Sequence, residues 1–192
     1  MNDTINTYPK YFNEIMDKTK ECGFDQLSDA NLGSLLSTLI SSKPNSKILE
    51  LGTGSGLSSS WILDGMDSNS TLQTVDNDKD LVAIAKEYLN KDNRVEFFIQ
   101  NGEDLILNTP KNSIDFIFAD TWPGKYNHLE ETLELLKVGG IYLVDDMLAR
   151  DNWPEGHEAK AINLINYLEN RADFNCTKLN WSTGIIICTK CK

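Results

Sequence analysis

The chain has 192 residues, which is enough for one domain with a sizeable core and hardly enough for two. Its net charge of −11 disfavours binding to bulk nucleic acid, because that affinity comes from cationic contacts to phosphate. With 40% hydrophobic residues and no apolar run near the roughly 20 residues that span a bilayer, the composition is that of a globular protein, not a membrane protein. The first residues show no signal-peptide pattern, so we expect a cytoplasmic protein.

Two helices are predicted near the N-terminus, over residues 6–22 and 28–41. Ser28 is a suitable N-cap for the second helix, because its hydroxyl can accept a hydrogen bond from a free backbone N–H. We expect residues 1–45 to form a helical cap that could cover the mouth of a site, and residues 46–192 to form a sheet. The chain shows no repeat and no linker, so a single domain over residues 1–192 is predicted.

Apolar runs and helical patterns alternate from residue 47 onward, which is typical of βαβ units and of a parallel sheet covered on both faces. The predicted strands are residues 47–51, 71–76, 95–100, 114–120 and 140–146. The predicted helices are residues 57–66, 78–90, 103–108 and 127–137, with Asp78 capping the second and Gly139-Gly140 ending the last.

The final third of the sequence has a different pattern. A helix over residues 155–172 precedes two strands, 175–181 and 184–190, which only Ser182-Thr183 separates. Strands joined so tightly must be antiparallel, because a parallel return needs a crossover of about a dozen residues. A parallel α/β sheet that ends in one antiparallel hairpin is therefore predicted.

The four cysteines, Cys22, Cys176, Cys188 and Cys191, are too few and too scattered for a disulfide scaffold. Cys188 and Cys191 form a C-x-x-C pair, but neither a second pair nor a histidine lies nearby. We expect reduced thiols without a chemical role.

The first predicted strand runs directly into three alternating glycines, Gly52, Gly54 and Gly56. Glycines at this spacing let the backbone turn tightly and approach a ligand closely. A loop for a dinucleotide has the spacing G-x-G-x-x-G and does not favour an acid such as Glu50 beside a pyrophosphate. The pattern suits a nucleoside ligand that lacks phosphate and carries positive charge, which describes S-adenosylmethionine.

Each of the five predicted parallel strands ends in acidic residues or is directly followed by them. In open α/β sheets, ligands bind beyond the carboxyl ends of the strands. Each acid alone could be a helix cap or part of a solvated turn, but acids at all the strand ends favour a common site. These residues are Glu50, Asp76, Glu103, Asp104, Asp120, Asp145 and Asp146.

These motifs resemble the class I S-adenosylmethionine-dependent methyltransferases, and within that class the small O-methyltransferases of the catechol and caffeoyl-CoA type. The resemblance covers roughly residues 26–190 and implies an α/β, Rossmann-like sheet of seven strands, order 3-2-1-4-5-7-6, with strand 7 antiparallel and helices on both faces. It rests on residues 48–56 (Ile-Leu-Glu-Leu-Gly-Thr-Gly-Ser-Gly), 74–76, 116–120, 135–140 and 144–146.

The resemblance implies a set of cofactor-binding residues. Ser58 would hold the methionine carboxylate, Asp76 the ribose, and Trp122 would pack near the adenine and the methyl group, unless it belongs to the core. The full set is Glu50, Gly52, Gly54, Gly56, Ser58, Asp76, Gly102, Glu103, Asp120 and Trp122.

The resemblance also implies a divalent metal site at Asp120, Asp145 and Asp146, where oxygen ligands suit Mg²⁺ and similar ions. The relatives usually have Asn at the third position, where this chain has Asp146. Successive side chains of a strand point to opposite faces, so Asp145 and Asp146 can share an ion only if the strand turns directly after Val144.

The catalytic lysine of the relatives corresponds to Pro123 in this chain. Lys125 lies two residues further on and could reach the site if the loop follows a different path. The acidic residue that some relatives carry near the final hairpin is also missing from residues 180–184. Catechol chemistry therefore does not follow from the resemblance.

The segment 151–157, Asp-Asn-Trp-Pro-Glu-Gly-His, follows the expected metal site. His157 could take a proton from the molecule that receives the methyl group, because the unperturbed pKa of histidine is about 6.5. Alternatively, His157 could simply lie in the first turn of a helix. His128 is expected to be structural. The candidate catalytic residues are Asp120, Lys125 and His157.

The expected function is S-adenosylmethionine-dependent methyl transfer to a hydroxyl of a small molecule, with a divalent metal such as Mg²⁺ as a possible aid. The alternatives are an N-methyltransferase, which usually carries an acceptor motif that Asp120-Thr-Trp-Pro123 does not match, and a cofactor-binding protein without catalysis. An NAD-dependent dehydrogenase fits the glycine spacing poorly. We expect no nucleic-acid or membrane partner, and a homodimer is compatible with the sequence.

Overall fold

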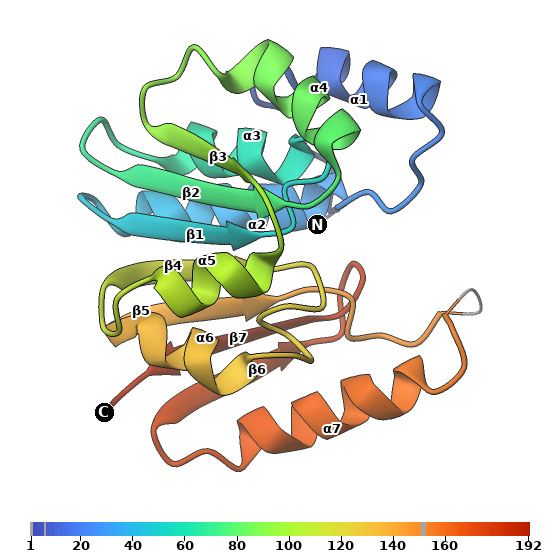
Figure 1. The fold of residues 1–192 in the computed structure, drawn as a ribbon. Helices are drawn as coiled ribbons and strands as arrows, with labels where there is room; N and C mark the ends of the chain where they lie inside the picture. Colours follow the sequence, from blue (N-terminus) through green and yellow to red (C-terminus); the bar gives the residue numbers. More distant parts are fainter. Residues whose placement is uncertain (1, 6, 151–152) are drawn as a thin grey trace.

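The computed structural model describes residues 2–5, 7–150 and 153–192 (Figure 1). In these residues a seven-stranded sheet has the order β3-β2-β1-β4-β5-β7-β6, and β7 is antiparallel to both neighbours, as predicted. The strands are β1 Lys47–Leu51, β2 Thr71–Asp76, β3 Val95–Ile99, β4 Ile114–Ala119, β5 Leu136–Val144, β6 Phe174–Leu179 and β7 Ile185–Lys190. The helices are α1 Phe12–Glu21, α2 Ala30–Ser41, α3 Leu57–Gly65, α4 Lys79–Leu89, α5 Gly102–Asn108, α6 Leu129–Leu135 and α7 His157–Glu169.

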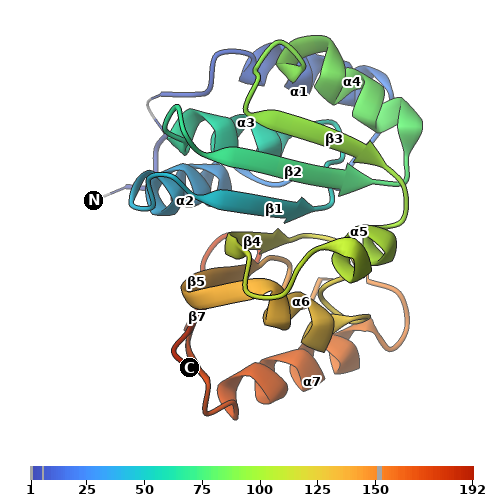
Figure 2. The same cartoon turned by 60° about the vertical axis from the view of Figure 1, so that its left-hand side comes forward.

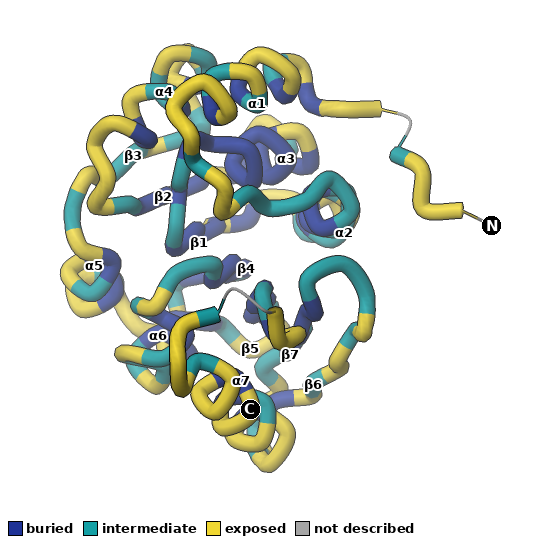
Figure 3. Tube along the Cα trace, turned by 90° about the vertical axis from the view of Figure 1, so that its right-hand side faces the viewer, coloured by how far each residue is buried: buried dark blue, intermediate teal, exposed yellow. Residues whose placement is uncertain are grey.

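Helices cover both faces of the sheet, and each face has its own apolar core (Figures 1 and 2). The core on one face includes residues of α1, α2 and α3, and the core on the other includes residues of α5, α6 and α7. Figure 3 shows that the central strands are largely buried, whereas the edge strands β3 and β6 are mostly intermediate or exposed, as are the outer surfaces of the helices. None of the helices in the described segments is long and apolar enough to cross a membrane.

Strand β4 shows why residues 116–119 form an uninterrupted apolar run. Phe116 and Phe118 pack into the core on the α2–α3 face, whereas Ile117 and Ala119 pack into the core on the α5–α7 face. Alternate side chains point to opposite faces, so a strand with helices on both sides needs a continuous apolar run.

The second helix begins at Ala30, two residues later than predicted, and Ser28 is not its cap. Asp29 takes the N-cap position of α2, where its side chain accepts a hydrogen bond from the Leu32 backbone N–H at 2.9 Å. The Ser28 hydroxyl instead donates to Asp120 Oδ2 at 3.2 Å. The prediction was wrong because two adjacent residues were both good caps, and the second one starts the helix. The Asp78 cap of α4 is confirmed.

The glycine pair 139–140 does not end a helix, so that prediction is also wrong. Helix α6 ends at Leu135, and β5 begins at Leu136, before the glycines. The pairing of β4 with β5 shifts register there, since Leu136 pairs with Ile114 but Ile141 pairs with Phe116. The glycines therefore lie in an irregular stretch of β5, where Gly139 has a φ of 81°.

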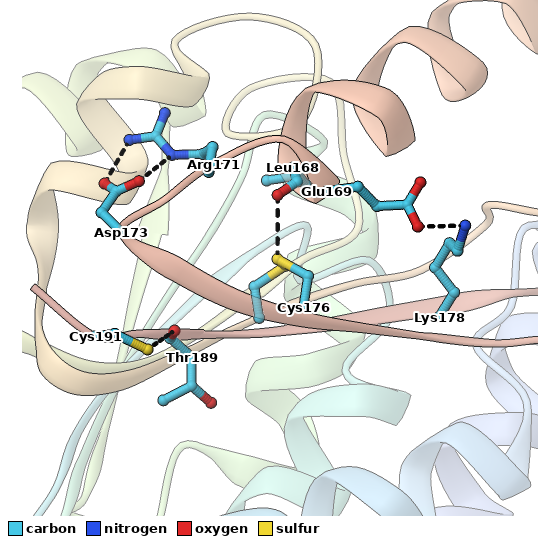
Figure 4. Close-up of a disulfide and its surroundings, with 9 residues drawn as sticks. Leu168, Glu169, Arg171, Asp173, Cys176, Lys178, Thr189 and Cys191 are labelled. Atoms are coloured by element: carbon cyan, nitrogen blue, oxygen red, sulfur yellow. Dashed lines mark hydrogen bonds and ion pairs between the residues drawn. A yellow bond between two sulfur atoms is a disulfide. The ribbon is translucent and has the colours of Figure 1, made fainter.

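Cys176 and Cys188 form a disulfide, contrary to the prediction of reduced thiols (Figure 4). They are direct partners in the register of β6 and β7, and their Cα atoms lie 4.1 Å apart. Antiparallel neighbours approach this closely at non-hydrogen-bonded positions, and sequence spacing does not reveal that register. Cys22 and Cys191 are free and exposed.

The loop that contains Gly52, Gly54 and Gly56, here called the glycine loop, packs against α4, and Gly56 provides a test of this packing. It has a φ of 94°, and a Cβ built on it would lie 2.7 Å from the Cβ of Ala85. We predict that Gly56→Ala lowers the free energy of unfolding by about 2–4 kcal/mol in urea denaturation, because it combines left-handed strain of about 1–2 kcal/mol with overpacking.

Gly23→Ala is the matched control. Gly23 has a φ of 77°, but nothing lies within 4 Å of the added Cβ. This control should therefore show only the backbone strain of about 1–2 kcal/mol. Equal losses for the two variants would mean that the contact with Ala85 does not constrain the loop.

Candidate active site

A cavity of about 720 Å³ lies beyond the carboxyl ends of β1, β2, β4 and β5. The order of the strands along the chain reverses between β1 and β4, which is where open α/β sheets bind ligands. Residues 24–28, which connect α1 to α2, line the cavity. The helices of the predicted cap, residues 1–45, therefore contribute to the cavity wall through their connecting segment. The lining includes residues of segments 24–28, 52–58, 76–81, 120–126, 145–150 and 153–157.

The glycine loop forms one wall of the cavity. Gly52 has a φ of 106°, and a Cβ on it would lie 3.0 Å from the backbone oxygen of Asp120. The Gly54 N–H donates to Asp76 Oδ2 at 2.9 Å, and the Asp78 N–H donates to Asp76 Oδ1 at 3.0 Å. The two backbone donors hold the Asp76 carboxylate at the cavity wall, and each oxygen keeps a lone pair for a ligand hydroxyl.

Glu50 lies behind the loop and is fully buried. Its Oε2 accepts hydrogen bonds from Ser59 and, at 2.6 Å, from Thr74. Burial is the main cause that raises the pKa of Glu50 to about 7, and hydroxyl donors, including Ser58, oppose it. Glu50 therefore supports the loop from within the protein.

The structure brings six of the ten predicted cofactor residues to the cavity. Trp122 is 45% exposed, which excludes a core position for its side chain. The six are Gly52, Gly54, Ser58, Asp76, Asp120 and Trp122, whereas Glu50, Gly56, Gly102 and Glu103 are outside the lining. Gly102 packs near Pro123, and Glu103 lies 3.9 Å from His128 Nε2.

Asp120, Asp145 and Asp146, here called the aspartate cluster, converge in the cavity. One carboxylate oxygen from each residue lies within 4.8 Å of a carboxylate oxygen of each of the other two residues. The chain turns directly after Val144, because Asp146 adopts a φ of 56°, so the condition for a shared site is met. Three hard oxygen donors at this spacing fit a divalent cation.

Burial and mutual repulsion dominate the electrostatics of the aspartate cluster. Burial, and then the charge of Asp145, raise the pKa of Asp120 well above its ordinary range, while Lys125 opposes this shift. Burial, and then the charge of Asp146, raise the pKa of Asp145 to about 6. Asp146 forms an ion pair with Arg150, Oδ1 to Nη2 at 2.8 Å.

Lys125 reaches the cavity although Pro123 occupies the position of the relatives' lysine. The backbone N–H groups of Lys125 and Tyr126 donate to the Trp122 carbonyl at 3.1 and 2.9 Å, which closes a tight turn. Lys125 is only 5% exposed and lines the cavity. The turn returns a lysine to the site at a later sequence position.

His157 begins α7 and contacts a group of aromatic residues at the cavity. Its Nε2 lies 3.3 Å from the Tyr126 hydroxyl, and its ring centroid lies 4.4 Å from that of Trp153. Burial, and then the charge of Lys125, lower the pKa of His157. Asp151 and Asn152, in the same predicted segment, lie outside the described residues. His128 caps α6 with a φ of 53° and is not part of the lining.

Sequence reasoning missed the residues that hold the aspartate cluster from distant parts of the chain. Ser28 contacts Asp120, and the Thr183 hydroxyl, from the turn before β7, donates to Asp145 Oδ1. The sequence suggested Ser28 only as a helix cap, and it gave no signal for Thr183. Tyr126 and Arg150 were also missed, although an aromatic and a cation so close to predicted site residues could have suggested them.

The sheet order, the antiparallel β7 and the glycine loop after β1 confirm the Rossmann-like fold that the resemblance implied. The chain belongs to the O-methyltransferase family, whose sequence profile matches residues 3–191. The protein named "Putative O-methyltransferase" from Mycobacterium ulcerans is 26% identical over 133 residues, covering 67% of this chain and 59% of the relative. The match thus spans less than two thirds of that relative.

Two solved structures share the fold over nearly the whole chain. The O-methyltransferase TomG from Streptomyces achromogenes, involved in tomaymycin synthesis, has a TM-score of 0.84 at 19% identity, over 97% of this chain and 92% of its own. The O-methyltransferase from Bacillus cereus has a TM-score of 0.81 at 20% identity, over 98% of this chain and 94% of its own.

The raised pKa of Glu50 predicts a pH-dependent stability. With a pKa of about 7 in the folded protein and 4.5 ordinarily, Glu50 keeps its proton while the unfolded chain releases it. Its contribution is fully present below pH 4.5 and is lost as pH rises to about 7. We predict that wild type loses about 3 kcal/mol relative to Glu50→Gln over this interval, measured by urea denaturation.

Glu14→Gln, at an exposed position on α1, is the control and should follow the wild-type pH profile. A difference between wild type and Glu50→Gln that stays constant from pH 4.5 to 7 would contradict the assignment of the shift to this carboxyl.

Proposed function

We propose that the protein transfers the methyl group of S-adenosylmethionine to a hydroxyl oxygen of a small molecule. One observation carries this proposal: a single cavity joins the glycine loop and Asp76 to the aspartate cluster and Lys125. Membership of the O-methyltransferase family supports it. The Streptomyces and Bacillus neighbours are complexes with SAM and SAH, respectively.

The donor half of the cavity has the features that a sulfonium nucleoside needs. Gly52 and Gly54 leave room for close approach, and the Asp76 carboxylate is held to accept hydrogen bonds from ribose hydroxyls. Ser58 provides a hydroxyl for the methionine carboxylate. S-adenosylmethionine supplies an activated methyl group, so the residues mainly align the acceptor oxygen with the breaking C–S bond.

The acceptor half supplies groups that can bind and deprotonate a hydroxyl. The aspartate cluster would hold a divalent cation, which lowers the pKa of a coordinated hydroxyl. Lys125 brings a positive charge beside these carboxylates and can stabilise a developing oxyanion. His157, whose pKa is lowered, is a neutral proton acceptor at neutral pH.

A small acceptor fits the size and charge of the site better than a macromolecule. The cavity of about 720 Å³ lies within the usual range of about 300–1,000 Å³ for small-molecule sites. The net charge of −11 disfavours nucleic acid as the acceptor.

The proposal is tested by methyl transfer from labelled S-adenosylmethionine to a panel of phenols and other hydroxyl compounds, with and without EDTA. We predict transfer to at least one hydroxyl acceptor, and loss of transfer with EDTA that added Mg²⁺ restores. Transfer that EDTA does not affect would remove the metal from the proposal. Methylation of amines alone would contradict transfer to oxygen.

The role of Lys125 is tested in the same assay. We predict that Lys125→Met lowers kcat by about 10²-fold or more and leaves the affinity for S-adenosylhomocysteine within about twofold, since the lysine acts on the acceptor. Lys111→Met, at an exposed lysine paired with Glu134, is the control and should retain wild-type kcat. An equal kcat for both variants would contradict the role of Lys125.

A further inference from the structure

Only one ring nitrogen of His157 is placed to receive a proton from the cavity. The other nitrogen, Nδ1, is buried, and none of residues 2–5, 7–150 and 153–192 forms a hydrogen bond with it. Packing fixes the ring, because its centroid lies 4.4 Å from that of Trp153 and 6.0 Å from that of Trp122. A proton can therefore reach His157 only at Nε2.

The Tyr126 hydroxyl lies at this nitrogen. Its oxygen is 3.3 Å from Nε2, and the two rings meet edge to face at 85° with their centroids 5.3 Å apart. Both residues line the cavity, Tyr126 in the turn after β4 and His157 as the first residue of α7. An imidazole nitrogen has one lone pair, so a ligand cannot bond to Nε2 while Tyr126 does. A proton from the cavity must pass the Tyr126 hydroxyl.

Burial and the neighbouring charges keep both groups uncharged at neutral pH. Burial, and then the charges of Lys125 and Lys160, lower the pKa of His157, and the charge of Asp146 opposes them. Burial, and then the charge of Asp146, raise the pKa of Tyr126 to about 12. A neutral phenol and a neutral imidazole can form one hydrogen bond in which the hydroxyl donates and Nε2 accepts.

We propose that Tyr126 contacts the hydroxyl of the methyl acceptor and passes its proton to His157, so that the two residues form a proton relay. The acceptor O–H bond breaks and its proton bonds to the Tyr126 oxygen, while the Tyr126 proton moves to Nε2 of His157. The electron pair left on the acceptor oxygen forms the bond to the methyl carbon, and the pair of the C–S bond returns to sulfur. The positive charge passes from the sulfonium to the imidazolium, which then releases the proton to water.

The proton relay rests on the proposed function and names the residue that first takes the proton in it. Lys125 is less suitable for this step. Its charge acts on the carboxyls of Asp120 and Asp145. An ammonium group has three donors and no lone pair, so a charged Lys125 can stabilise the acceptor oxygen but cannot remove its proton.

The first arm of the test locates the proton on the His157 ring. The chain has two histidines, so the full chain labelled with ¹⁵N-histidine gives two ring systems in a long-range ¹H–¹⁵N correlation spectrum, and His157→Gln assigns them. We expect neutral His157 to carry its proton on Nδ1, because Nε2 accepts from Tyr126. Tyr126→Phe should shift the proton toward Nε2, since that N–H can then bond to water in the cavity.

Tyr8→Phe is the control for this arm, because it removes the hydroxyl of a tyrosine that is 43% exposed and is not part of the cavity lining. It should leave the proton on Nδ1. A wild-type ring with its proton on Nε2 would overturn the proton relay, whether or not any acceptor is methylated.

The second arm measures methyl transfer to the hydroxyl compound that wild type methylates fastest in the panel. We predict that Tyr126→Phe and His157→Gln each lower kcat by about 10²-fold, because each interrupts the same proton path. The double variant should fall no more than about threefold below either single variant, since the two residues act as a unit. The affinity for S-adenosylhomocysteine should stay within about twofold, and Tyr8→Phe should retain wild-type kcat.

The outcomes of the second arm separate the proton relay from the proposed function. Wild-type kcat in Tyr126→Phe, or a double variant whose loss equals the product of the two single losses, would overturn the relay and leave the function standing. A wild type that methylates no hydroxyl compound would contradict the proposed function, and the relay with it.

Discussion

The close approach of two backbone segments, at Gly52 and Asp120, is the constraint on which the cavity depends. A Cβ at residue 52 would lie 3.0 Å from the Asp120 carbonyl oxygen, and the φ of 106° is itself suited to glycine. Strands β1 and β4 are neighbours in the sheet, so the residues that follow them meet at its carboxyl edge. This contact joins the glycine loop to the aspartate cluster in one cavity, as the proposed transfer from a donor to an acceptor requires.

Two departures from the resembling enzymes have local structural counterparts. Pro123 replaces the expected lysine, but the turn closed by the Trp122 carbonyl brings Lys125 to the cavity. Asp146 replaces the usual Asn and adds a negative charge, which the ion pair with Arg150 balances at 2.8 Å. The cavity therefore still contains a lysine and a third side-chain oxygen, although the residues differ from those of the relatives. This arrangement supports methyl transfer to oxygen as the proposed chemistry.

The sequence predicted the parts of the structure that depend on local patterns. β1 and β2 have the predicted bounds, because apolar runs bordered by Gly52 and by polar residues define a strand within one segment. The sheet order followed from the family resemblance. The convergence of the aspartates was conditional, since only the structure could give the left-handed turn at Asp146. The Cys176–Cys188 pair and the contact of Thr183 with Asp145 depend on register and on distant segments, which sequence spacing does not encode.

The measurement that tests the central claim most directly is calorimetric titration of the full chain with S-adenosylmethionine and with NAD, for wild type and for Gly52→Ala. The glycine loop, Asp76 and the aspartate cluster predict one S-adenosylmethionine bound per chain, no heat with NAD, and at least tenfold weaker binding in the variant. Binding of NAD as tight as that of S-adenosylmethionine, or unchanged affinity in Gly52→Ala, would contradict it.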